Sequence, residues 1–143
     1  MSLAGVWKGL TDNRVRTDPN HQDPTLRGRT YAIPFVRVWE AALRLSSGTA
    51  SGGLRGWSVT AADEDGGVIT AESRTLVFRF VDDVEILLSL DENAQTRVDV
   101  ASSSRVGKGD LGKNARRVRG FLRALDREVG AGPDTILDPT LPW

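Results

Sequence analysis

An alternation of hydrophobic and polar side chains runs through residues 76–90 and is the longest regular pattern in the sequence. The hydrophobic residues at even-numbered positions are Phe78, Phe80, Val84, Ile86, Leu88 and Leu90. A two-residue period of this kind predicts a long β-strand with one hydrophobic face. Asp82 belongs to the same series. We therefore expect either a bulge that turns its carboxylate outward or burial of that carboxylate with a partner.

A second strand is predicted shortly after the first. Val98, Val100 and Ser102 share one face there, and they alternate with polar or small residues. Residues 91–94, which lie between the two strands, read Asp-Glu-Asn-Ala and are typical of a turn. The two strands are therefore predicted to form an antiparallel hairpin.

Shorter strand patterns precede this hairpin. Three further strands are predicted at residues 30–34, 54–63 and 68–74. The last two are joined by residues 64–67, where two glycines allow a tight turn. These strands are expected to extend the sheet that the hairpin begins.

Two helices are predicted from hydrophobic side chains that recur every three or four residues. The first covers residues 35–45, with a stripe formed by Phe35, Val38, Trp39, Ala42 and Leu45. The second begins at Asp110, which can cap it, and extends to residue 129. Its stripe is formed by Leu111, Ala115, Val118, Leu122, Leu125 and Val129.

The order of these elements, β-α-β-β-β-β-α, predicts an α+β fold. Its simplest form is a four- to five-stranded, mainly antiparallel sheet with two helices packed on one face. Residues 1–29 are rich in Asp, Asn, Pro and Gly and are predicted to form an irregular N-terminal arm. Residues 30–129 are predicted to form a single α+β domain, and residues 130–143 a C-terminal coil.

Composition narrows the class of protein. In 143 residues, 39% are hydrophobic and 27% charged, which is typical of a soluble globular chain. The net charge is zero, which argues against a nucleic-acid or anionic-membrane partner. One His and no Cys argue against a zinc site, and no metal or cofactor is assigned. No segment is long and apolar enough to predict a membrane span, so we expect a cytoplasmic protein.

The glycine-rich stretch before the second helix is the first candidate for chemistry. Residues 107–112 read G-x-G-x-x-G between a strand and a helix, as in a dinucleotide-binding turn. No strand follows that helix, however, and Asp110 would repel a pyrophosphate, so this interpretation is rejected. Free N–H groups at the helix start, together with Arg105 and Lys108, could instead hold another anion. The favoured alternative is a helix cap by Asp110, with the glycines permitting tight backbone geometry.

The carboxylates of the long strand are the second candidate. Asp82, Asp83 and Glu85 would suit acid–base catalysis or a hard metal ion if they converged. Arginines occur on the same strands and at their ends: Arg74, Arg79, Arg97 and Arg105. Cross-strand ion pairs are therefore the favoured interpretation. In particular, we expect Arg105 to be held by one of the three carboxylates in a structural ion pair.

Several of these segments together resemble a known family. They are the stretch from Phe78 to Glu85, the triplet Val98-Asp99-Val100, the stretch from Ser102 to Asn114, and two earlier pieces around Asn13 and Glu72. The family is catalogued as domain of unknown function 1499, and the resemblance covers residues 12–127. Many members carry Cys where this chain has Arg14, and many carry membrane or export signals that this sequence does not show.

The resemblance implies a compact α+β domain and supplies no reaction. It marks as motif positions Arg74, Asp82, Asp83, Glu85, Ser104, Arg105, Gly107, Asp110, Gly112 and Asn114. These positions coincide with the two candidates that the residues themselves suggest.

Three hypotheses of function follow. The favoured one is a non-catalytic domain that binds a small anionic or polar ligand, or a protein partner, through the turn 105–114. Its candidate binding residues are Arg105, Gly107, Lys108, Gly109, Asp110, Gly112 and Asn114. The alternative is a hydrolase or metal-assisted enzyme that uses Asp82, Asp83 and Glu85. The polar cluster around those carboxylates comprises Arg74, Arg79, Asp82, Asp83, Glu85 and Ser104. A purely structural domain is the third hypothesis.

Overall fold

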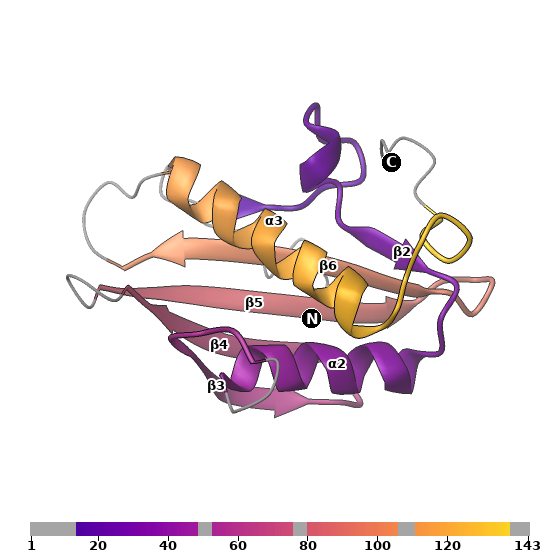
Figure 1. Ribbon diagram of the computed structural model, residues 1–143, viewed down its shortest axis with the longest axis horizontal. Helices are drawn as coiled ribbons and strands as arrows, with labels where there is room; N and C mark the ends of the chain where they lie inside the picture. Colours follow the sequence, from indigo (N-terminus) through magenta and orange to yellow (C-terminus); the bar gives the residue numbers. More distant parts are fainter. Residues whose placement is uncertain (1–13, 49–52, 76–79, 106–110, 138–143) are drawn as a thin grey trace.

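The computed structural model describes residues 14–48, 53–75, 80–105 and 111–137. Six strands and two α-helices lie in these ranges, with one 3-10 turn (Figure 1). In chain order they are β1 (Arg14–Arg16), η1 (Pro24–Leu26), β2 (Arg29–Tyr31), α2 (Phe35–Ser47), β3 (Trp57–Asp63), β4 (Val68–Arg74), β5 (Val81–Leu90), β6 (Thr96–Ser104) and α3 (Leu111–Glu128).

The strands form one antiparallel sheet. Its order is β1-β6-β5-β4-β3, and β2 pairs with β6 beside β1. The predicted α+β class is confirmed, but the sheet has six strands rather than four or five. The difference arises in the predicted irregular arm, where β1 pairs with the last residues of β6. The prediction was wrong there because a three-residue strand is too short to show a period.

The predicted hairpin of β5 and β6 is confirmed, with a continuous register from Asp82 opposite Ser104 to Leu90 opposite Thr96. Its first strand was expected to start before Phe80, and this is wrong. Phe80 precedes β5 and is 48% exposed. Its backbone N–H donates to the hydroxyl of Thr75, and its carbonyl accepts from the N–H of Thr75. These contacts close the β4–β5 connection and keep Phe80 out of the core.

Both helices cover the same face of the sheet, as predicted (Figure 1). On α2 the predicted stripe is buried from Val38 onward, and the helix ends at Gly48 in the left-handed conformation. On α3 the predicted stripe is buried at Val118, Leu122 and Leu125, and Val129, which directly follows the helix, is buried as well. The predicted start of this helix, Asp110, lies outside the described residues.

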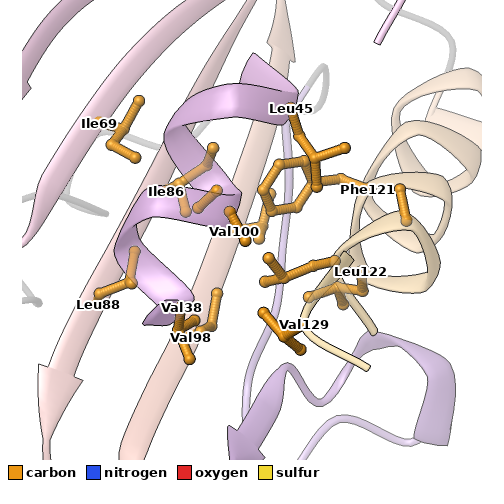
Figure 2. Close-up of a cluster of buried hydrophobic side chains, with 14 of the residues drawn as sticks. Val38, Leu45, Ile69, Ile86, Leu88, Val98, Val100, Phe121, Leu122 and Val129 are labelled. Carbon is orange, nitrogen blue, oxygen red and sulfur yellow. The ribbon is translucent and has the colours of Figure 1, made fainter. Parts of the chain in front are cut away.

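The core fills the space between the two helices and the sheet. Figure 2 shows Val38 and Leu45 of α2 and Phe121 of α3 packed above Ile86 and Val100. Phe121, which the predicted stripe did not include, is 1% exposed. Its ring stacks on Trp57 of β3 with centroids 5.6 Å apart. This contact joins the last helix to the strand farthest from it in the sheet.

The loop between β1 and β2 passes around the edge of the sheet and is held at both faces. On the face of the sheet away from the helices, which we call the open face, the hydroxyl of Thr17 donates to the carboxylate of Asp99 at 2.8 Å. On the helical face, Arg119 of α3 donates to Asp23 and to the hydroxyl of Thr25. This part of the predicted irregular arm is therefore tied to β6 and to α3.

The stacked ring of Phe121 provides a test of the core. We expect Phe121→Ala to lower the free energy of unfolding by ~3–5 kcal/mol, because a buried aromatic side chain is lost and a cavity remains. Urea unfolding measures this change. The matched control is Phe80→Ala at an exposed site, which should change stability by less than ~0.5 kcal/mol. Equal effects of the two substitutions would contradict the described core.

The carboxylate of Asp23 provides a pH test. Hydrogen bonds from Thr25 and then Arg119 lower the pKa of this carboxyl from 3.8 to about 2. A group whose pKa is lower in the folded state stabilises the fold above its unfolded pKa, and this contribution is lost as the pH falls toward the folded value. We expect the stability difference between wild type and Asp23→Asn, measured by urea unfolding, to shrink between pH 4 and pH 2. A difference that stays constant over this range would contradict the assignment.

Candidate functional site

The structure divides the predicted site residues between the two faces of the sheet. Successive residues of a strand point to opposite faces, so Asp82 points toward the helices and Asp83 away from them. Ser104 lies opposite Asp82 and shares its face. Arg105 and Glu85 belong to the open face with Asp83. The predicted turn and carboxylates are therefore parts of two distinct clusters.

The first cluster, which we call the inner polar cluster, lies between the sheet and the start of α3. It consists of Asp82, Ser102, Ser104, Lys113, Asn114 and Arg117. Asp82 is 1% exposed. Its Oδ2 atom lies 2.9 Å from Lys113 Nζ and 2.8 Å from Arg117 Nη1. These are ion pairs by distance, although neither has the angles of a hydrogen bond. Of the two expectations for Asp82, burial with a partner is confirmed.

Asn114 connects the other members of the inner polar cluster. It is fully buried, and its Oδ1 atom accepts hydrogen bonds from Ser102 Oγ at 2.8 Å and from Arg117 Nη1 at 3.0 Å. Its Nδ2 atom donates to Ser104 Oγ at 3.0 Å. One amide thus joins two residues of β6 to the first turns of α3. Such a network fixes position because each contact has a preferred direction.

Helical spacing explains why these side chains meet. Asn114 and Arg117 are three residues apart, so they lie on the same face of α3, next to the hydrophobic stripe. Lys113 and Arg117 lie outside the hydrophobic stripe that the sequence predicts for this helix. The signal that could have identified them is Asp82 itself, since a carboxylate on a hydrophobic face requires a cation nearby.

The second cluster, which we call the open-face ion pairs, lies on the side of the sheet away from the helices. Arg105 donates to both oxygens of Asp83 at 2.9 and 2.7 Å, and to Glu72 at 2.7 Å. These bonds, first to Asp83 and then to Glu72, raise the pKa of Arg105 above its ordinary value. The predicted pairing of Arg105 with a carboxylate of β5 is confirmed for Asp83. The Arg105 side chain is 44% exposed, so the pair lies at the surface.

A further open-face ion pair crosses β6. Arg14 of β1 contacts Glu85 of β5 at 2.7 Å, although β6 separates their two strands. Ala101 of β6 pairs with Glu85 and leaves room for the two long side chains to meet. Ala101 is 1% exposed on this otherwise open face. The ion pair therefore covers Ala101 on the open face of β6. Arg14 thus serves to hold Glu85.

The other predicted site residues have the following places. Arg74 lies 3.7 Å from Glu72 and is half exposed. Gly112 is exposed in the first turn of α3. Arg79, Gly107, Lys108, Gly109 and Asp110 lie outside the described residues. The two ends of the predicted binding turn, Arg105 and Asn114, point to opposite faces of the sheet.

The three candidate catalytic carboxylates are not brought together. Asp82 contacts two cations on the helical face, whereas Asp83 and Glu85 each contact an arginine on the open face. Within the described ranges, no group of three or more His, Asp or Glu side chains is arranged to hold a metal ion. None of the described helices is long and apolar enough to cross a membrane.

These features define an α+β domain whose antiparallel sheet carries two helices on one face and a buried polar cluster beside the last helix. The protein-family model described as "Protein of unknown function (DUF1499)" matches residues 9–125. The chain therefore belongs to the DUF1499 family, as the resemblance of its motifs had predicted. A comparison with curated proteins gave no match.

The buried ion pairs of Asp82 provide a stability test. We expect Asp82→Asn to lower the free energy of unfolding by ~3–5 kcal/mol, because it leaves the cations of Lys113 and Arg117 without their shared carboxylate. The matched control is Asp83→Asn, which removes the same charge from the next residue, where the pair is exposed. Urea unfolding of the control should barely differ from wild type. A small effect at both positions would show that Asp82 is not a buried, paired charge.

Proposed function

We propose that this domain is a non-catalytic binding module that holds a small anionic ligand where α3 begins. The observation that carries the proposal is the convergence of Lys113 and Arg117 on a single carboxylate. Within the described residues, this end of α3 brings two cations to one buried anion. Arg117 is largely enclosed, while the Lys113 side chain is 27% exposed although its Nζ atom lies 2.9 Å from the buried carboxylate.

The local backbone supports the same ligand class. The first N–H groups of an α-helix have no partner within the helix, and the helix dipole places partial positive charge there. Gly112 is exposed in this first turn and has no side chain to keep a ligand away. A lysine, a glycine and the positive end of the helix dipole at one helix start suit an anion such as phosphate, sulfate or a carboxylate.

A hydrolytic function through Asp82, Asp83 and Glu85 receives less support. Acid–base catalysis by paired carboxylates requires both groups to face one substrate. Here the sheet itself separates Asp82 from the other two. We therefore adopt binding rather than catalysis as the function to test.

The proposal predicts a localised, salt-sensitive response to anions. In an NMR titration at low ionic strength with phosphate, sulfate, acetate and a nucleotide, we expect amide shifts confined to residues 102–105 and 111–117. Lys113→Gln should abolish these shifts, because it removes the lysine charge at this helix start while Arg117 still pairs with Asp82. Added sodium chloride should weaken them, since exposed charges are screened over ~10 Å at 0.1 M salt.

The matched control for this titration is Arg116→Gln, which removes an exposed cation from the same turn of α3. It should bind anions as the wild type does. A thermal melt of each variant confirms that it is folded. Shifts that persist in Lys113→Gln, or a wild-type spectrum unchanged at millimolar anion, would refute the proposal.

A further inference from the structure

A hollow of about 460 Å³ lies at the end of the sheet opposite the inner polar cluster. Its lining residues belong to the start of α2, the β3–β4 turn and the end of β5. Its lining residues are Phe35, Glu64, Asp65, Gly66, Gly67, Leu88, Ser89 and Leu90. The volume falls within the ~300–1,000 Å³ usual for ligand pockets. The hollow is wide open to solvent.

Apolar side chains form part of the lining of the hollow. Leu90 is 57% exposed, the highest value among the large hydrophobic residues of the described chain that stand out to solvent. Val36, which follows Phe35 in the first turn of α2, is 48% exposed. Phe35 itself is partly buried and stacks on Trp39 with ring centroids 6.1 Å apart. An aromatic ring and an exposed leucine in one hollow form a surface that gains from being covered.

The rim of the hollow carries one sign of charge. Glu64 and Asp65 line it, and both are exposed. Glu92 is exposed in the turn that follows Leu90. The lining residues include no cation. An apolar surface with an acidic rim is complementary to a segment that carries lysine or arginine next to a large apolar side chain.

At the edge of the hollow, the backbone of the β3–β4 turn lies close to the backbone of β5. The N–H of Leu88 donates to the carbonyl of Gly67 at 2.7 Å. A side chain at Gly67 would begin 1.9 Å from the carbonyl oxygen of Leu88, and its φ of +71° also favours glycine. The β3–β4 turn is therefore fixed against β5, and a partner need not order it on binding.

The described ends of the chain lead away from the hollow. Ile136 pairs antiparallel with Tyr31, and the N–H of Leu137 donates to the carbonyl of Thr30. The C-terminal segment therefore runs away from Phe35. At the other end, Arg14 lies opposite Ser103, beside the inner polar cluster. Within the described residues no segment of this chain covers Leu90, and we therefore look to another molecule for the occupant.

We propose that this hollow, with its acidic rim, binds a basic, apolar peptide segment of a protein partner. A small molecule is less suited, because pockets for small ligands enclose most of the ligand surface. An extended segment can place an apolar side chain on Phe35 and Leu90 and direct its cations to Glu64 and Asp65. This surface is separate from the proposed anion site, since the two lie at opposite ends of β5.

The test uses a fluorescein-labelled synthetic peptide of sequence Lys-Leu-Lys-Leu-Lys and the intact protein. Fluorescence anisotropy at low salt should show binding, and the peptide with Glu in place of Lys should not bind. Two variants should each weaken binding by about tenfold: the double variant Glu64→Gln/Asp65→Asn, which removes the rim charge, and Leu90→Ser, which removes the apolar contact. All three positions are exposed, so the variants should fold.

The matched control is Asp134→Asn, an exposed acidic residue at the opposite edge of the sheet, and it should bind the peptide as the wild type does. Lys113→Gln should also bind normally, which separates this proposal from the anion site. Absence of peptide binding, or equal binding by all variants, would overturn the proposal. Sedimentation of the protein alone tests the other occupant: self-association that Glu64→Gln/Asp65→Asn abolishes would assign the hollow to a second copy and overturn the proposal of a foreign partner.

Discussion

The buried carboxylate of Asp82 determines where the last helix meets the sheet. A charged group with 1% exposure is tolerated only beside opposite charge, and both of its cations come from the first two turns of α3. The hydrophobic stripe of that helix would allow it to slide or rotate on the sheet, since apolar contacts have little directional preference. The ion pairs and the buried amide of Asn114 remove that freedom. The position of the helix start, and of any group bound there, depends on them.

Two neighbouring aspartates show how strongly the sheet separates environments. Asp82 and Asp83 are adjacent in the chain, yet the first is buried against a helix and the second has a side chain that is 46% exposed. The difference comes only from the alternation of side chains along β5. On the open face, long arginine and glutamate side chains lie across small residues such as Ala101 and protect them from water. Polar residues of β5 thus make ion pairs on both faces of one sheet.

The elements with a clear period were predictable from the sequence. The β5–β6 hairpin, the strand 68–74 and the two helical stripes follow from local patterns, and the structure reproduces them. The strand β1 was not predictable, because its three residues show no period and their partners lie at the far end of β6. The cations of Asp82 were missed for a related reason. Which helical residues face a strand depends on how the helix is rotated, and that is decided by tertiary contacts.

The division of the candidate site was harder still to predict. Arg105 and Asn114 flank one glycine-rich turn, so the sequence suggests a single binding loop. Ser104 points toward the helices, so the next residue, Arg105, points to the open face. Asn114 lies on α3 and points to the helical face of the sheet. Proximity in sequence therefore did not mean proximity in space. The alternation that predicted β5 contains this information, but it applies only once the end of β6 is known.

The pairing of two short strands with β6 has a consequence for how the domain behaves among other chains. A long, regular sheet edge exposes a row of unpaired backbone groups on which a foreign strand can assemble. Here the edge beside β6 is divided between β1 and β2, each three residues long. Thr17, directly after β1, exchanges hydrogen bonds with Val100 through its N–H and its hydroxyl. In the described part of the chain, β6 therefore presents no continuous template on this side, and a foreign strand would meet only short strands there.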